Sequence, residues 1–121
     1  MARILTVDDA ALMRRIIKTT LKRAGYTEIY EAADGVQALE KYNLIKPDLV
    51  LMDITMPNMN GLAALKAIRA ADPASNVVMC TAMGQENMVI EAIRSGAKDF
   101  IVKPFKPERL LSMVTTIVGS P

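Results

Sequence analysis

The feature that most constrains the fold is a regular alternation of short apolar segments with longer amphipathic ones. Five short segments rich in Leu or β-branched residues are spaced along the chain, at residues 4–7, 29–32, 49–52, 77–81 and 100–102. Apolar runs of this length, bounded by turn-forming residues, predict strands that are buried on both faces. Strands of this kind need helical crossovers between them, so a parallel sheet is expected.

The segments between the predicted strands have the periodicity of helices. After a first helix that Gly25 closes, helices are predicted at residues 35–43, 62–71, 86–94 and 107–114. In the first helix, Ile17 and Leu21 lie on an apolar stripe, whereas Arg14 and Lys18 lie on the side expected to face solvent. Ile93 belongs to the stripe of the fourth helix that is expected to be buried. The chain is therefore expected to be an α/β protein of the flavodoxin-like type, with a doubly wound, five-stranded parallel sheet in the order 2-1-3-4-5 and five helices.

Length and composition narrow the class of protein. The 121 residues suit one domain, expected to span 1–121. A net charge of +2, with only three Tyr and two Phe, argues against a nucleic-acid-binding face. Apolar runs fall short of the ~20 residues of a membrane span. Cys80 is the only cysteine, so an inert buried thiol and a cytoplasmic location are expected.

Chemically active side chains follow four of the five predicted strands. Asp8 and Asp9 follow the first strand, Asp53 follows the third, Thr81 ends the fourth, and Lys103 follows the fifth. Ligand sites in sheets of this type lie at the carboxyl ends of the strands, so these side chains are expected to converge there. Helix capping explains one aspartate of the first pair equally well, but it does not explain the whole set.

Three carboxylates at one edge repel one another unless a cation lies between them. The chain has no histidine, which leaves oxygen ligands and favours Mg²⁺ as the cofactor. Beside that ion, the carboxylate of Asp53 is suited to attack phosphorus. Lys103 would then supply positive charge and Thr81 a hydrogen bond to the phosphoryl oxygens.

Four motifs together resemble the receiver domains of two-component response regulators, over the whole chain. They are Val7-Asp8-Asp9, the segment from Met52-Asp53 to Asn60-Gly61, Thr81-Ala82, and Lys103-Pro104-Phe105. The resemblance is greatest to the stand-alone chemotaxis receivers of the CheY group in Gram-positive and Thermotoga-like bacteria. It implies a monomeric receiver domain with no output domain.

The resemblance also implies roles for individual residues. Asp53 would accept a phosphoryl group from a CheA-like histidine kinase, and the backbone carbonyl of Thr55 would complete the metal site of the three aspartates. The Lys103–Pro104 peptide would be cis. Thr81 and Phe100 would be the switch pair, moving together once the phosphoryl group is bound.

The implied partners follow from the same family. The phosphorylated form would bind the flagellar motor switch protein, of the FliM or FliY type, and a phosphatase is a further implied partner. The protein would be a signalling switch rather than an enzyme, catalysing only its own Mg²⁺-dependent phosphorylation and dephosphorylation. A single-domain phosphorelay intermediate, which passes its phosphate to a histidine phosphotransfer protein, is the open alternative.

Two other functions of similar folds fit the residues less well. A phosphatase of the haloacid dehalogenase type needs a second acid two residues after its nucleophile, where Thr55 stands. A flavin carrier needs hydrogen-bond donors for the FMN phosphate where Asp8 and Asp9 stand.

Overall fold

The structure is a computed structural model and describes residues 2–121. Strands and helices alternate in the order β1 (Arg3–Val7), α1 (Ala11–Arg23), β2 (Glu28–Ala32), α2 (Gly35–Ile45), β3 (Leu49–Asp53), α3 (Gly61–Ala71), β4 (Val77–Thr81), α4 (Glu86–Arg94), β5 (Asp99–Val102) and α5 (Pro107–Val118). All strand pairs are parallel, in the order β2-β1-β3-β4-β5, which confirms the predicted fold. No helix in the described part of the chain is long and apolar enough to cross a membrane.

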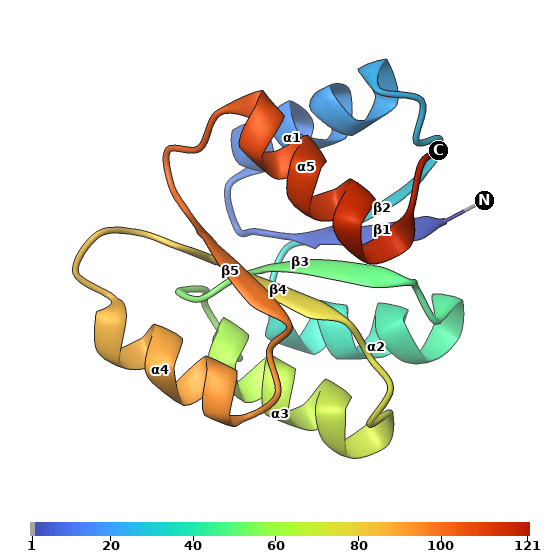
Figure 1. The fold of residues 1–121 in the computed structure, drawn as a ribbon. Helices are drawn as coiled ribbons and strands as arrows, with labels where there is room; N and C mark the ends of the chain where they lie inside the picture. The colour runs from blue at the N-terminus through green and yellow to red at the C-terminus, as the bar shows by residue number, and fades with distance from the viewer. Residues whose placement is uncertain (1) are drawn as a thin grey trace.

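The helices form a layer on each face of the sheet. Helices α1 and α5 lie on one face, and α2, α3 and α4 lie on the other (Figure 1). Each layer encloses its own core, the first built around Ile17, Leu21, Leu49, Leu51, Leu110 and Val114, the second around Val50, Met52, Ala64, Leu65, Ile68 and Met79. Because successive residues of β3 serve opposite cores, this strand is apolar at every position from Leu49 to Met52.

Helix α5 extends beyond its predicted end at residue 114. It runs to Val118 and stops at Gly119, whose φ of 83° is favourable only for glycine. The hydroxyl of Tyr26 donates to the Gly119 carbonyl oxygen at 2.6 Å and lies 3.1 Å from the Thr115 hydroxyl. A residue distant in sequence therefore secures the end of this helix, which local periodicity does not reveal.

The predicted orientations of Arg14, Lys18 and Ile93 are wrong. Arg14 and Lys18 do not simply face solvent: α1 packs over β1 and the edge strand β2, and both cations pair with Glu31 of that strand. Ile93, expected in the core, is 44% exposed. Only Ala92 of α4 is fully buried, because this helix contacts the sheet near the short edge strand β5 and leaves a groove beside it.

Candidate functional site

The carboxyl ends of β1, β3 and β5 bring three of the predicted side chains into contact. The ammonium nitrogen of Lys103 donates to Asp8 Oδ2 at 2.7 Å and lies 3.2 Å from Asp53 Oδ1. The Lys103–Pro104 peptide is cis, and the Lys103 backbone nitrogen donates to the Thr81 carbonyl oxygen at 2.6 Å. The lysine is thus tied to the end of β4 as well as to the two carboxylates.

Asp8, Asp9 and Asp53 form a cluster, here called the acid cluster. One carboxylate oxygen from each lies within 4.8 Å of the others. Ligands of one octahedral Mg²⁺ ion, each at about 2.1 Å from the metal, lie roughly 3–4 Å apart, so this spacing and the all-oxygen donor set fit the ion. Asp8 is buried, Asp53 is partly buried and Asp9 is exposed, so the cluster opens to solvent on one side.

The backbone around the acid cluster is closely packed. The amide nitrogen of Asp8 donates to the Ala32 carbonyl oxygen at 3.1 Å, which extends the β1–β2 pairing, and Asp8 Oδ1 accepts from the Ala10 amide at 2.9 Å. Gly61, at the start of α3, lies against the backbone of Asp53. A Cβ atom at that position would be 1.9 Å from the Asp53 carbonyl oxygen, so only glycine fits there.

Burial and neighbouring charges raise the pKa of Asp53. Burial is the larger cause, and the charges of Asp8 and Asp9 add to it, whereas Lys103 acts in the opposite direction. Burial alone would lower the pKa of Lys103, but its hydrogen bond to Asp8 and the charges of both partners raise it overall. The lysine therefore stays charged, and the cluster keeps an excess of negative charge that a divalent cation would balance.

Thr81 and Phe100 line one groove. Thr81 is buried at the end of β4, whereas Phe100 is 37% exposed on β5. The groove between α4 and β5 has a volume of about 680 Å³. Its remaining walls are mostly apolar and include Met83, Val89, Ile90, Ile93 and Val102. The two residues of the predicted switch pair therefore border the same space.

Thr55 lies two residues beyond Asp53 and contacts a residue that the sequence analysis missed. Gln85 donates from Nε2 to the Thr55 hydroxyl at 2.8 Å and accepts from the Ala82 amide at 2.7 Å. The three-residue spacing from Ala82 to Gln85 suits a side-chain-to-backbone bond and was a local signal for this contact. The Thr55 carbonyl stays a predicted metal ligand.

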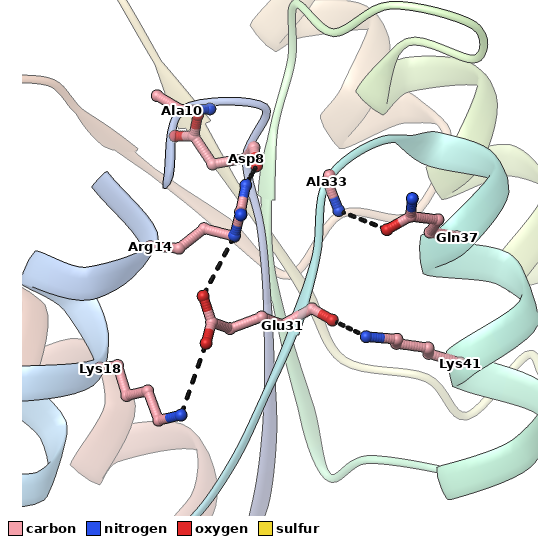
Figure 2. A network of polar contacts seen from close by, with 8 residues as sticks. All are labelled: Asp8, Ala10, Arg14, Lys18, Glu31, Ala33, Gln37 and Lys41. Atoms are coloured by element: carbon pink, nitrogen blue, oxygen red, sulfur yellow. Dashed lines mark hydrogen bonds and ion pairs between the residues drawn. The ribbon is translucent and has the colours of Figure 1, made fainter. Parts of the chain in front are cut away.

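The contacts that Arg14 makes with Asp8 and Glu31 beside the site were not predicted. The guanidinium group of Arg14 donates from Nη1 to the Asp8 carbonyl oxygen at 2.6 Å and from Nε to Glu31 Oε1 at 3.1 Å (Figure 2). No local pattern signals this contact, since it depends on the pairing of Thr6 with Glu31 in the sheet.

Comparison with known proteins agrees with this geometry. Residues 4–115 match the family described as response regulator receiver domain. The chain is 53% identical to the chemotaxis protein CheY of Thermotoga maritima over 115 residues, which cover 95% of this chain and 96% of that protein. It is 55% identical to the CheY of Bacillus subtilis over 112 residues, 93% of each.

A solved structure extends the comparison to three dimensions. The crystal structure of a CheX–CheY–BeF3–Mg²⁺ complex from Borrelia burgdorferi matches with a TM-score of 0.90 and 35% identity, covering 96% of this chain and 88% of that one. The chain therefore belongs to the response regulator receiver domain family, as a homologue of the CheY chemotaxis proteins, and is a phosphorylation-activated signalling switch.

Proposed function

We propose that Asp53 accepts a phosphoryl group from a CheA-like histidine kinase and that the phosphorylated chain binds the flagellar motor switch. The single observation that carries this proposal is the placement of Asp53: its partly exposed carboxylate lies 3.2 Å from the Lys103 ammonium group and within the acid cluster. A carboxylate in this setting can attack phosphorus while fixed positive charge stabilises the transferring oxygens.

Each residue of the site has its own role in the proposed phosphoryl transfer. Asp8, Asp9 and Asp53 would hold Mg²⁺, with the Thr55 carbonyl as a further ligand. The bound ion would neutralise charge on the phosphoryl oxygens. An Asp53 oxygen forms the new bond to phosphorus as the bond to the donor's imidazole nitrogen breaks, and that nitrogen leaves with the electron pair. Lys103 pairs with the acquired negative charge.

Thr81 and Phe100 would convert this chemistry into a change of surface. A hydroxyl at the end of β4 can donate to the new phosphoryl group, and movement of Thr81 would alter the groove that it shares with Phe100. The face of α4, β5 and α5 would then present a different shape to a FliM- or FliY-like partner. This apolar groove is suited to an amphipathic segment of a partner protein.

The same proposal includes a further partner, the cellular location and the oligomeric state of the protein. The Borrelia burgdorferi complex joins its CheY to CheX, and a CheX-like partner, in the role of a phosphatase, is proposed for this chain as well. We further propose that residues 1–121 act in the cytoplasm as a monomeric receiver domain.

Mass spectrometry with acetyl phosphate and Mg²⁺ tests the phosphoryl acceptor. The wild type should gain the mass of one phosphoryl group, and Asp53→Asn should gain none. The proposal is wrong if the wild type gains no mass, or if both proteins gain it equally.

Binding measurements test the output. Phosphorylated wild-type protein should bind the N-terminal peptide of the motor switch protein more tightly than unphosphorylated protein, and Thr81→Ala should accept phosphate but gain less affinity. An equal gain in both proteins would contradict the role of Thr81. Phosphate transfer to a histidine phosphotransfer domain, without peptide binding, would instead identify a phosphorelay intermediate.

A further inference from the structure

Residues 8–10 form a turn, here called the acid turn, in which the side chains of Asp8 and Asp9 are held differently. Asp8 is secured through both carboxylate oxygens, by the Ala10 amide and by Lys103. Asp9, the middle residue of the turn, is exposed. Ala10 occupies the N-cap position and has no side-chain acceptor, and the first turn of the helix has no acidic residue. The usual capping contacts are therefore missing beside Asp9.

The side chain of Arg14, one turn into α1, contacts the backbone of the acid turn instead. Its Nη1 atom donates to the Asp8 carbonyl oxygen at 2.6 Å, and its backbone amide donates to the Ala10 carbonyl oxygen at 3.2 Å. The two carbonyl groups flank Asp9 in the chain. The second of these hydrogen bonds is the ordinary first hydrogen bond of the helix, so the contact specific to the Arg14 side chain is the one to the Asp8 carbonyl, directly before the exposed Asp9.

Glu31 holds Arg14 in this position. Its carboxylate accepts from Arg14 Nε at 3.1 Å and from Lys18 Nζ at 3.4 Å, while its backbone carbonyl accepts from Lys41 of α2 (Figure 2). Helices on both faces of the sheet thus secure one residue of the edge strand β2. The negative charge of Glu31 also offsets the guanidinium charge, which would otherwise repel a cation in the acid cluster.

We propose that Arg14 is a positioning residue for the Mg²⁺ site, acting through the Asp8 carbonyl, and that Glu31 in turn orients Arg14. The inference rests on the proposed function, since it assumes that the acid cluster binds Mg²⁺. Residues that orient metal ligands without touching the metal commonly contribute tenfold to a hundredfold in affinity.

Positioning and simple electrostatics make opposite predictions for this arginine. Removing a positive charge near a cation site strengthens cation binding through Coulomb's law. Removing a group that orients the ligands weakens it. The sign of the change in Mg²⁺ affinity therefore separates the two effects.

The experiment is a Mg²⁺ titration of the unphosphorylated full chain, followed by amide chemical shifts in NMR spectra. Arg14→Ala should weaken Mg²⁺ binding about tenfold or more. Arg15→Ala is the matched control, because Arg15 is the neighbouring cation of the same helix and is exposed; its Mg²⁺ affinity should equal or slightly exceed that of the wild type. Arg14→Lys, which keeps the charge but not the two-pronged donor, should recover only part of the lost affinity.

Two outcomes would overturn the inference, and a third would overturn the proposed function beneath it. Unchanged or tighter Mg²⁺ binding by Arg14→Ala means that the arginine does not position the site. If that variant does not fold, Glu31→Gln decides: its Mg²⁺ binding should weaken severalfold, and unchanged affinity would reject the role. If the wild type and Asp9→Asn both fail to bind Mg²⁺, the metal site itself is wrong.

Discussion

Two loops at the same edge of the sheet are held in opposite ways. In the acid turn, Asp8 is bonded through its amide, its carbonyl and both carboxylate oxygens. In the loop between β4 and α4, residues 82–85, Met83 is 86% exposed and Gly84 has open space around it. The side chain of Gln85 anchors this loop, and the Gly84 amide adds a longer bond of 3.4 Å to the Glu86 carboxylate. The groups proposed for chemistry are thus preorganised, whereas the loop that directly follows Thr81 is held by few contacts.

This difference is what a phosphorylation switch requires. Phosphoryl transfer gains from fixed charges, because they need no rearrangement in the transition state. A response needs two arrangements of similar free energy, and shifting such an equilibrium from mostly off to mostly on takes about 5.5 kcal/mol. When a loop is held by few contacts, few contacts have to be broken to change its arrangement, so less of this free energy is needed for that step.

Removing the charge of Lys103 should have the largest effect. Lys103→Met leaves the buried Asp8 carboxylate without its partner, which is expected to lower the free energy of unfolding by about 3–5 kcal/mol. Urea unfolding at neutral pH without Mg²⁺ measures this change. Added Mg²⁺ should restore part of the stability of the variant. A loss of less than about 1 kcal/mol, as for an exposed ion pair, would show that the acid turn is not preorganised in this way.

A pair of glycine substitutions compares the backbone beside Asp53 with the β4–α4 loop. Gly61→Ala would place a Cβ atom 1.9 Å from the Asp53 carbonyl oxygen, a contact with backbone that cannot swing away. We expect a loss of about 3 kcal/mol in the free energy of unfolding. Gly84→Ala meets no atom within 4 Å, and its φ of 90° should cost only about 1–2 kcal/mol. Equal losses in chemical denaturation would contradict the contrast between the regions.

Gln85→Ala should loosen the β4–α4 loop with little effect on the whole molecule. It removes the acceptor for the Ala82 amide and the donor to Thr55, with an expected loss of about 1 kcal/mol. Hydrogen exchange at the Ala82 amide should accelerate. Met83→Ala is the control, since this exposed side chain should not alter that exchange. Unchanged exchange in Gln85→Ala would mean that other contacts hold the loop.

The smallest expected effect is the pH dependence that Glu31 contributes. Burial acts to raise the pKa of Glu31, but hydrogen bonds from Arg14 and Lys18 bring it below its ordinary value of 4.5. A carboxylate with a lowered pKa stabilises the fold above its unfolded pKa, and this contribution is lost as the pH falls through the folded value. Glu31→Gln should therefore lower stability by at most about 1 kcal/mol at pH 7, and the difference should shrink below pH 4.5. Thermal unfolding of the wild type and of Glu31→Gln across this pH range measures the difference in stability. If that difference does not change with pH, the ion pairs of Glu31 are not its source.

The sequence predicts the residues of the acid cluster better than the residues that hold the cluster in place. Asp8, Asp53 and Lys103 stand next to apolar strands, and parallel strands bring their carboxyl ends together, so local pattern was enough to assemble them. Arg14 was misplaced because helical periodicity describes where a Cα atom lies, whereas a long side chain can reach across a helix edge. Its partner Glu31 depends on strand register, which is a property of the whole sheet. Ile93 was misplaced for a similar reason, since nothing local shows how far α4 lies from β5.

The bond from Tyr26 to Gly119 has a practical consequence for handling this protein. It secures the carboxyl end of α5, which lies at the opposite side of the sheet from the carboxyl ends of the strands (Figure 1). Ala2 lines the same cavity as Ile117 and Val118. A surface tether, fluorophore or fused reporter attached at either terminus would therefore point away from the phosphorylation chemistry. Immobilised protein should remain open to kinase and ion alike, which makes the chain suited to surface-based binding measurements.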